Sequence, residues 1–314
     1  MLGSALLFFL GILGLAVGTL LAVRGAVQVA DRYGLGETAV GVTVLAVGTD
    51  LPELWVAITG GLQELDGIPA SGMVVGAALG SAIAQGTLVL GVAGLVGYLP
   101  SGKRVIRRDG GAMLLAIGLA AVLMADGTLT RVDGAVLLLM YGVYLHTLLR
   151  TERRATPDEP AEETGRLPHP ALAIAGGIVT LSLGAHVVVT EGVALATALG
   201  VSQSLIAATF VGVGTSLPEL ALSVRAARER HGRLAVGNII GSNTFDLLVP
   251  IGTGAVIHPL TVEARSSAFD LGALALVSLV ALYFLRRRRG LQRNEAMALV
   301  VIYLTYVGVR TYLG

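Results

Sequence analysis

Long apolar segments separated by short polar connections limit the folds open to this chain more than any other feature. Hydrophobic residues make up 54% of its 314 residues and charged residues 14%, whereas a soluble domain carries about 25% charged residues. A helix needs about 20 mostly apolar residues to cross a bilayer. The sequence therefore predicts an all-α membrane protein with ten transmembrane helices, near residues 4–29, 36–61, 69–98, 110–126, 132–150, 171–194, 202–226, 233–257, 268–285 and 295–313.

The basic residues are distributed unevenly over the connections between these segments. If the N-terminus lies outside, the connections after the odd-numbered segments are cytoplasmic, and 19 of the 22 Lys and Arg residues lie in or beside them. The other three are Arg131, Arg265 and Arg310. Because cytoplasmic loops are enriched in Lys and Arg, this bias predicts that both termini are outside. The short linker and small size favour a prokaryotic inner membrane.

The most polar stretch divides the chain into two halves of five segments each. It covers residues 151–170 and reads as a flexible cytoplasmic linker. We therefore expect a first five-helix repeat over residues 1–150 and a second over residues 171–314.

The two halves resemble each other in sequence. Residues 34–54 match residues 200–220 at an offset of 166, and residues 75–81 match residues 236–242 at an offset of 161. A repeat with an odd number of spans must insert the second time with the opposite topology. The sequence thus predicts two inverted repeats, an arrangement typical of secondary transporters that bind their substrate near the midplane. Duplication that only builds a scaffold is the alternative.

One motif is repeated inside these matching segments. Residues 48–54 read Gly-Thr-Asp-Leu-Pro-Glu-Leu, and residues 214–220 read Gly-Thr-Ser-Leu-Pro-Glu-Leu. A carboxylate at the centre of a bilayer costs about 2.5 kcal/mol or more, which makes each acid a candidate functional residue. Proline removes a backbone donor, so we expect each helix to kink or break here. Carbonyls freed at this depth are tolerated where they line a cavity.

The next segment of each half adds further polar side chains. Ser81 and Gln85 are four residues apart, as are Ser242 and Asp246, so each pair lies on one helix face. These segments also carry small residues at a spacing that lets helix backbones approach closely, namely Gly76 with Gly80 and Gly237 with Gly241.

The candidate ligands of both halves offer oxygen atoms only. They are Thr49, Asp50, Glu53, Ser81, Gln85, Thr215, Ser216, Glu219, Ser242 and Asp246. Oxygen ligands that include carboxylates suit hard cations, above all Ca²⁺ and also Na⁺, whereas zinc or copper would call for nitrogen or sulfur. The chain contains no cysteine. We expect Ca²⁺ and Na⁺, or H⁺, as transported ions and no prosthetic group.

With these motifs the chain resembles the sodium/calcium exchanger family, within the cation/calcium exchanger superfamily, over essentially its whole length. The second half carries the family signature intact at residues 214–219 and 237–243. The resemblance implies exchange of Ca²⁺ for Na⁺ by alternating access, with segments 1 and 6 sliding past the core. It implies that Glu53 and Glu219 are central Ca²⁺ ligands and that Asp246 and Gln85 complete the ring. It implies oxygen atoms for flanking Na⁺ sites from Thr49, Thr215, Ser216, Ser81 and Ser242.

The first half departs from the family pattern at the site itself. Asp50 stands where serine is usual, Gln85 stands where Asn or Asp is usual, and Ala77 and Ala82 replace two asparagines. Asp50 lies three residues from Glu53, and close carboxylates raise each other's proton affinity. The sequence therefore leaves Na⁺, H⁺ and an additional cation open.

The same residues are compatible with functions other than Na⁺/Ca²⁺ exchange. The runner-up is H⁺/Ca²⁺ exchange, followed by a cation channel whose pore the acids would line, and by a membrane scaffold or sensor that transports nothing. The sequence carries no nucleophile–base pair and no cofactor fingerprint, so we do not expect an enzyme. The expected partners are membrane lipid and inorganic cations, without nucleic acid. The sequence does not fix the oligomeric state or the stoichiometry.

Overall fold

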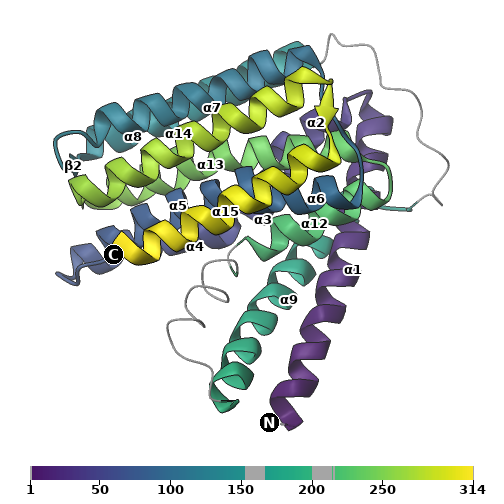
Figure 1. The fold of residues 1–314 in the computed structure, drawn as a ribbon, viewed down its shortest axis with the longest axis horizontal. Helices are drawn as coiled ribbons and strands as arrows, with labels where there is room; N and C mark the ends of the chain where they lie inside the picture. The colour runs from purple at the N-terminus through teal and green to yellow at the C-terminus, as the bar shows by residue number, and fades with distance from the viewer. Residues whose placement is uncertain (1, 153–166, 200–213, 215, 314) are drawn as a thin grey trace.

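The computed structural model describes residues 2–152, 167–199, 214 and 216–313, and these are almost wholly helical (Figure 1). The first half contains α1 Leu2–Tyr33, α2 Glu37–Val40, the π-helix η1 Gly41–Leu45, α3 Ala46–Thr49, α4 Leu51–Leu65, α5 Ser71–Ala84, the π-helix η2 Gln85–Val89, α6 Leu90–Val96, α7 Lys103–Leu123 and α8 Arg131–Glu152. The second half contains α9 Pro170–Ala198, α12 Leu217–Arg228, α13 Gly232–Ile257, α14 Ala264–Arg287 and α15 Arg293–Leu313.

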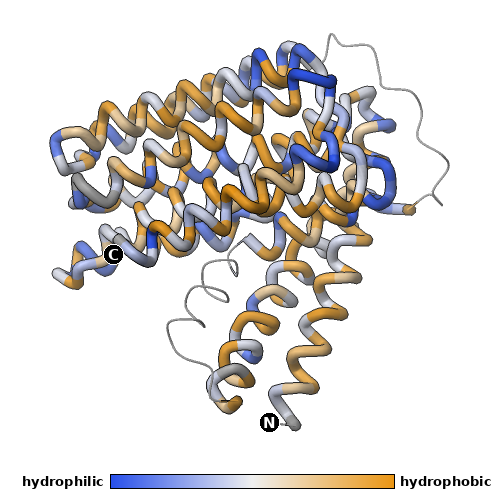
Figure 2. Tube along the Cα trace, viewed as in Figure 1, coloured by the Kyte–Doolittle hydropathy of each residue, from blue (hydrophilic) through white to orange (hydrophobic). Residues whose placement is uncertain are grey.

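Six helices among the described residues are long and apolar enough to cross a membrane, judged by length and composition. A seventh candidate is the pair Glu37–Thr49 and Leu51–Leu65, which is bent by 45° at a break. Hydrophobic residues run along the helices, and hydrophilic residues gather at many of their ends (Figure 2). The expected segment 202–226 falls largely on residues 200–213 and 215, which lie outside the described residues, as does most of the expected linker.

Helices α1 and α9 form an antiparallel pair that projects from the other helices (Figure 1). Glycines bring their backbones together. A Cβ atom added to Gly11 would lie 3.0 Å from the carbonyl oxygen of Gly184, and one added to Gly18 would lie 2.7 Å from that of Gly177. Because only glycine allows so close an approach, α1 and α9 pack as one unit.

Helix α13 is buried almost along its whole length and packs against α4, α5, α7, α8 and α12. Its apolar residues surround the helix, as expected for a helix in the centre of a bundle. Gly237 packs against the backbone of Thr38, and Gly241 packs against that of Val42, so the glycine spacing in this half brings two site helices together as expected. Gly76 and Gly80 have no such neighbour among the described residues.

Two short antiparallel strand pairs lie at the two ends of α7. Strand β1, Leu99–Pro100, pairs with β4, Gly290–Leu291. Strand β2, Thr128–Leu129, pairs with β3, Leu260–Thr261. Each pair joins one strand from each half, and β3 follows β1 by 161 residues, the offset that also relates residues 75–81 to residues 236–242.

Candidate cation site

The first repeated motif forms the break between α3 and α4. Asp50 sits in the break with φ −87° and ψ 8°, after α3 ends at Thr49 and before α4 begins at Leu51. Pro52 lies in the first turn of α4. Backbone N–H groups in the first turn have no intrahelical acceptor, so the N–H that proline lacks costs no hydrogen bond there. The expected break is confirmed, and the proline begins a new helix there.

The second motif has the same local geometry where it is described. Ser216 has φ −90° and ψ 8° and precedes α12, which begins at Leu217 with Pro218 in its first turn. Thr215 lies outside the described residues, so its expected role as a ligand stays a prediction.

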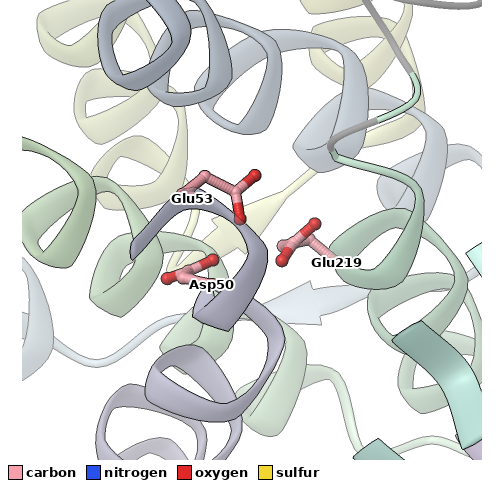
Figure 3. A group of neighbouring side chains, drawn as sticks. All are labelled: Asp50, Glu53 and Glu219. Carbon is pink, nitrogen blue, oxygen red and sulfur yellow. The ribbon is translucent and has the colours of Figure 1, made fainter. Parts of the chain in front are cut away.

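Three carboxylates from the two motifs meet in the interior. Oxygen atoms of Asp50, Glu53 and Glu219 lie within 4.8 Å of one another, and all three side chains are buried. Figure 3 shows Glu53 and Glu219 pointing toward each other, with Asp50 beside them. Ca²⁺ binds oxygen at about 2.3–2.6 Å, so ligands on opposite sides of it are about 5 Å apart. The three acids have the spacing that a single cation requires.

Hydrogen bonds extend this group to the neighbouring helices. The amide Nε2 of Gln85 donates to Asp246 Oδ2 at 3.2 Å and to Ser81 Oγ at 3.1 Å. Ser81 Oγ in turn donates to Glu53 Oε1 at 3.4 Å and lies 3.4 Å from Ser216 Oγ. One cluster therefore contains residues from both motifs and from α5, η2 and α13.

Two further expected ligands contribute less directly. The hydroxyl of Thr49 donates to the carbonyl oxygens of Leu45 and Ala46 in its own helix, at 3.1 and 3.3 Å. Ser242 is fully buried on α13, and its hydroxyl oxygen has no hydrogen-bond partner in the part of the chain that the structure describes. A threonine hydroxyl that donates still has lone pairs free to bind a cation.

The cluster leaves many buried oxygen atoms without a hydrogen-bond partner among the described residues. They are Asp50 Oδ1 and Oδ2, Glu53 Oε2, Gln85 Oε1, Glu219 Oε1 and Oε2, Ser242 Oγ and Asp246 Oδ1. Buried polar atoms are nearly always satisfied, and burying an unpaired charge is very costly. A hard cation would satisfy this donor set, because every one of these atoms is oxygen.

The structure also adds features that sequence reasoning missed. Residue Gln85 begins the π-helix η2, a distortion common at functional sites, and the helical pattern of the sequence around it did not predict this distortion. Tyr141 of α8 packs edge-on against Phe245, the residue before Asp246, with 5.5 Å between the ring centroids. Asn243 donates to the sulfur of Met113 at 3.6 Å, and its buried side-chain carbonyl oxygen has no hydrogen-bond partner within the described ranges. Asn243 belongs to the signature segment 237–243, which was the available signal.

Comparison with known proteins decides the family. The model of the family described as sodium/calcium exchanger protein matches residues 3–150 and 169–312. The chain belongs to the sodium/calcium exchanger family. A relative called putative antiporter CaxA, from Alkalimonas amylolytica, is 30% identical over 295 residues, which cover 91% of each chain. Sodium/calcium exchanger MaX1 from Methanosarcina acetivorans is 28% identical, with 98% of each chain covered.

A solved structure agrees with this assignment. The sodium-calcium exchanger NCX_Mj, soaked with Na⁺ and Sr²⁺, superposes with a TM-score of 0.82 at 27% identity, and the match covers 97% of both chains. The family resemblance expected from residues 214–219 and 237–243 is therefore confirmed. This sodium/calcium exchanger family member is an integral membrane protein of a transporter family that exchanges cations, and not of an enzyme family.

Proposed function

We propose that this protein exchanges Ca²⁺ for Na⁺ across a prokaryotic inner membrane by alternating access. The observation that carries the proposal is the set of buried, unpartnered oxygen atoms contributed by both halves of the chain. Glu53 and Glu219 are the central Ca²⁺ ligands, and Gln85 and Asp246 complete the ring. Thr49, Ser81, Thr215, Ser216 and Ser242 supply oxygen atoms to flanking Na⁺ sites.

Competition for the same oxygen atoms couples the two fluxes. Ca²⁺ and Na⁺ both prefer these ligands, so the pocket holds one type of cargo at a time. A pocket without cargo would carry several uncompensated carboxylates through the membrane interior, where charge is costly. The empty pocket therefore resists the change between the states open to the two sides of the membrane. After Ca²⁺ has crossed, the protein returns with Na⁺ bound, and Na⁺ moves in the opposite direction.

The proposed architecture has ten transmembrane helices in two inverted repeats, residues 1–150 and 171–314, joined by the linker 151–170. Contacts between equivalent positions support it. Gly177 and Gly184 follow Gly11 and Gly18 by 166 residues, and Gly11 contacts Gly184 while Gly18 contacts Gly177. Reciprocal contacts of this kind are what a two-fold axis produces. The distribution of the basic residues supports a topology in which both termini lie outside.

The pair α1 and α9 is the moving part in this proposal. Its tight glycine contacts favour movement as one body, and Ile178 of α9 packs directly against Gly48 in the broken helix. A shift of the pair along the core would thus change the cover over the motif that contains Asp50 and Glu53.

Transport by purified protein in lipid vesicles tests the function. Radiolabelled Ca²⁺ uptake is measured against an outward Na⁺ gradient, and then against an outward proton gradient at matched membrane potential. The proposal expects uptake that depends on Na⁺. Uptake driven only by the pH difference would replace Na⁺ with H⁺, the alternative that Asp50 favours through its closeness to Glu53. Downhill Ca²⁺ flux without any counter-ion would mean a channel.

A further inference from the structure

A buried aspartate on α7 binds a tyrosine on α8 outside the cation site. The hydroxyl of Tyr144 donates to Asp109 Oδ1 at 3.1 Å, and both side chains are buried. Arg108 donates to the same carboxylate through Nε at 2.8 Å and through Nη2 at 2.9 Å. It also donates through Nη1 to the hydroxyl of Thr151 at 3.1 Å, near the end of α8. The ring of Tyr144 is therefore fixed at the end of α8 that leads into the linker.

Tyr144 also packs against the broken helix that carries the first motif. It forms a buried apolar cluster with Leu148 of its own helix and with Ala39 and Val42. Ala39 belongs to α2 and Val42 to η1, and these elements lead through α3 to the break at Asp50. The cluster is separate from the main apolar core. Tyr144 thus connects α7 and α8 to the part of the broken helix that precedes the break.

This part of the broken helix, Glu37–Thr49, is here called the leading half-helix. It lies between α13 and α8. On the α13 side, Gly237 and Gly241 meet its backbone directly, whereas on the α8 side it meets the Tyr144 cluster. It contains the π-helix η1, a distortion that is common at functional sites. A movement of the leading half-helix relative to α8 therefore breaks or remakes its contact with Tyr144.

The leading half-helix takes this position while the cation site is closed to water. Asp50, Glu53 and Glu219 are each at most 3% exposed, and the half-helix ends at Thr49, immediately before Asp50. In the proposed topology its other end, at Glu37, faces the cytoplasm. The leading half-helix therefore lies between the site and the cytoplasm.

We propose that Tyr144, fixed by its bond to Asp109, is a positioning residue that holds the leading half-helix closed on the cytoplasmic side. This inference rests on the proposed function and deepens it, because it assigns a residue outside the cation site to one of the two opening steps. Cations from the cytoplasm bind only when that side is open, so their apparent affinity scales with the open fraction. Loss of the Tyr144 hydroxyl should raise this fraction.

The second half of the chain provides a matched comparison. Asp270 and Tyr306 follow Asp109 and Tyr144 by 161 and 162 residues. The hydroxyl of Tyr306 donates to Asp270 Oδ1 at 2.9 Å, and Arg310 Nε lies 3.2 Å from the same oxygen. In the proposed topology this pair lies on the opposite side of the membrane, because α14 begins there and α15 ends there. Tyr306→Phe therefore removes the same kind of bond at the other end of the protein.

Membrane vesicles of known orientation test the effect on each side. Everted vesicles from bacterial cells that express the protein present its cytoplasmic side to the medium, and right-side-out vesicles present the other side. Both are loaded with Na⁺, and the apparent KM for Ca²⁺ uptake is measured. We expect Tyr144→Phe to lower this KM about fivefold in everted vesicles and not in right-side-out vesicles. Tyr306→Phe should leave the KM in everted vesicles unchanged.

An introduced thiol tests the movement without transport. The chain contains no cysteine, so a single cysteine reports how often water reaches its position. Ala39→Cys places it in the Tyr144 cluster, at a position that is 3% exposed. In detergent, a polar maleimide should label this thiol about fivefold faster after addition of Tyr144→Phe. Addition of Tyr306→Phe should leave the labelling rate unchanged.

Three results would overturn the inference: an unchanged cytoplasmic KM in Tyr144→Phe, an equal change of KM on both sides, or the same change in Tyr306→Phe. Unchanged labelling of the thiol would overturn it as well, and a lower melting temperature with unaltered KM values would leave Tyr144 a purely structural role. All of these results leave the proposed function intact as long as an outward Na⁺ gradient drives Ca²⁺ uptake. Absence of that uptake in the original protein would instead contradict Na⁺/Ca²⁺ exchange itself.

Discussion

Gln85 and Asp246 occupy equivalent positions in the two halves and contact each other, with Gln85 Nε2 donating to Asp246 Oδ2 at 3.2 Å across 161 residues of sequence. A residue that meets its own counterpart must lie beside the axis that relates the halves. The contact is stable because the two residues differ. An amide donates to a carboxylate here, whereas two carboxylates would repel each other.

Gln85→Glu should therefore destabilise the protein when cations are absent. Two like charges 4 Å apart repel by about 4 kcal/mol at the effective dielectric constant of partly solvated sites, and Ca²⁺ should restore much of the loss. The measurement is the melting temperature in detergent with a chelator and with Ca²⁺. The double variant Gln85→Glu/Asp246→Asn is the matched control, since it reverses donor and acceptor. An unchanged melting temperature of Gln85→Glu in chelator would contradict the contact.

Glu53→Gln and Glu219→Gln should each reduce Ca²⁺ transport by about a hundredfold or more. Each change removes one charged ligand of the bound cation, and loss of one partner of a buried ion pair costs about 3–5 kcal/mol. Both proteins should still fold, since amides are easier to bury than carboxylates. Initial rates of Ca²⁺ uptake and size-exclusion profiles check this. Glu263→Gln, at an exposed position, is the control. Substantial uptake by both site variants would remove these residues from the set of central ligands.

A pH-dependent ion pair joins the beginnings of two site helices. His231 Nδ1 lies 2.6 Å from Glu37 Oε1, and this hydrogen bond raises the pKa of His231, with smaller contributions from the charges of Glu229 and Asp31. A raised pKa in the folded state means that this stabilisation is fully present below the unfolded value of about 6.5 and is lost as pH rises through the folded value.

The melting temperature of the protein should therefore fall as pH is raised above about 6.5, and His231→Gln should lack this part of the decline. Thermal unfolding in detergent across that pH range measures both. Glu37→Gln provides a second test, because it removes the other partner of the same pair. If the melting temperatures of the original protein, His231→Gln and Glu37→Gln depend on pH in the same way, the contact contributes nothing to stability.

Gly18→Ala should separate α1 from α9. The added methyl group would lie 2.5 Å from the backbone nitrogen of Leu181 and 2.7 Å from the carbonyl oxygen of Gly177, and overpacking of this kind costs about 1–3 kcal/mol. We expect a lower melting temperature and slower Ca²⁺ uptake. Gly176→Ala is the matched control, because no described residue has an atom within 4 Å of its added methyl group. Equal behaviour of the two variants would contradict close backbone packing.

The sequence predicts those parts of the site that depend on local rules. Pro52 predicts the break at Asp50, and the spacing of Ser81 and Gln85 predicts a shared helix face that their hydrogen bond confirms. Features that depend on tertiary packing could not be predicted. The π-helix at Gln85 and the packing of Tyr141 against Phe245 depend on neighbours distant in sequence, and no local pattern encodes them.

The strand pairs have a consequence for how the protein is made. Synthesis proceeds from β1 to β4, yet β2 pairs with β3 and β1 pairs with β4, so the pairs are nested along the chain. When the first half enters the membrane, both of its strands still have unpaired edges, which are sites of unwanted association. They remain open until the second half follows. The last strand to leave the ribosome closes the first one, so both strand pairs are complete only after β4 has been made.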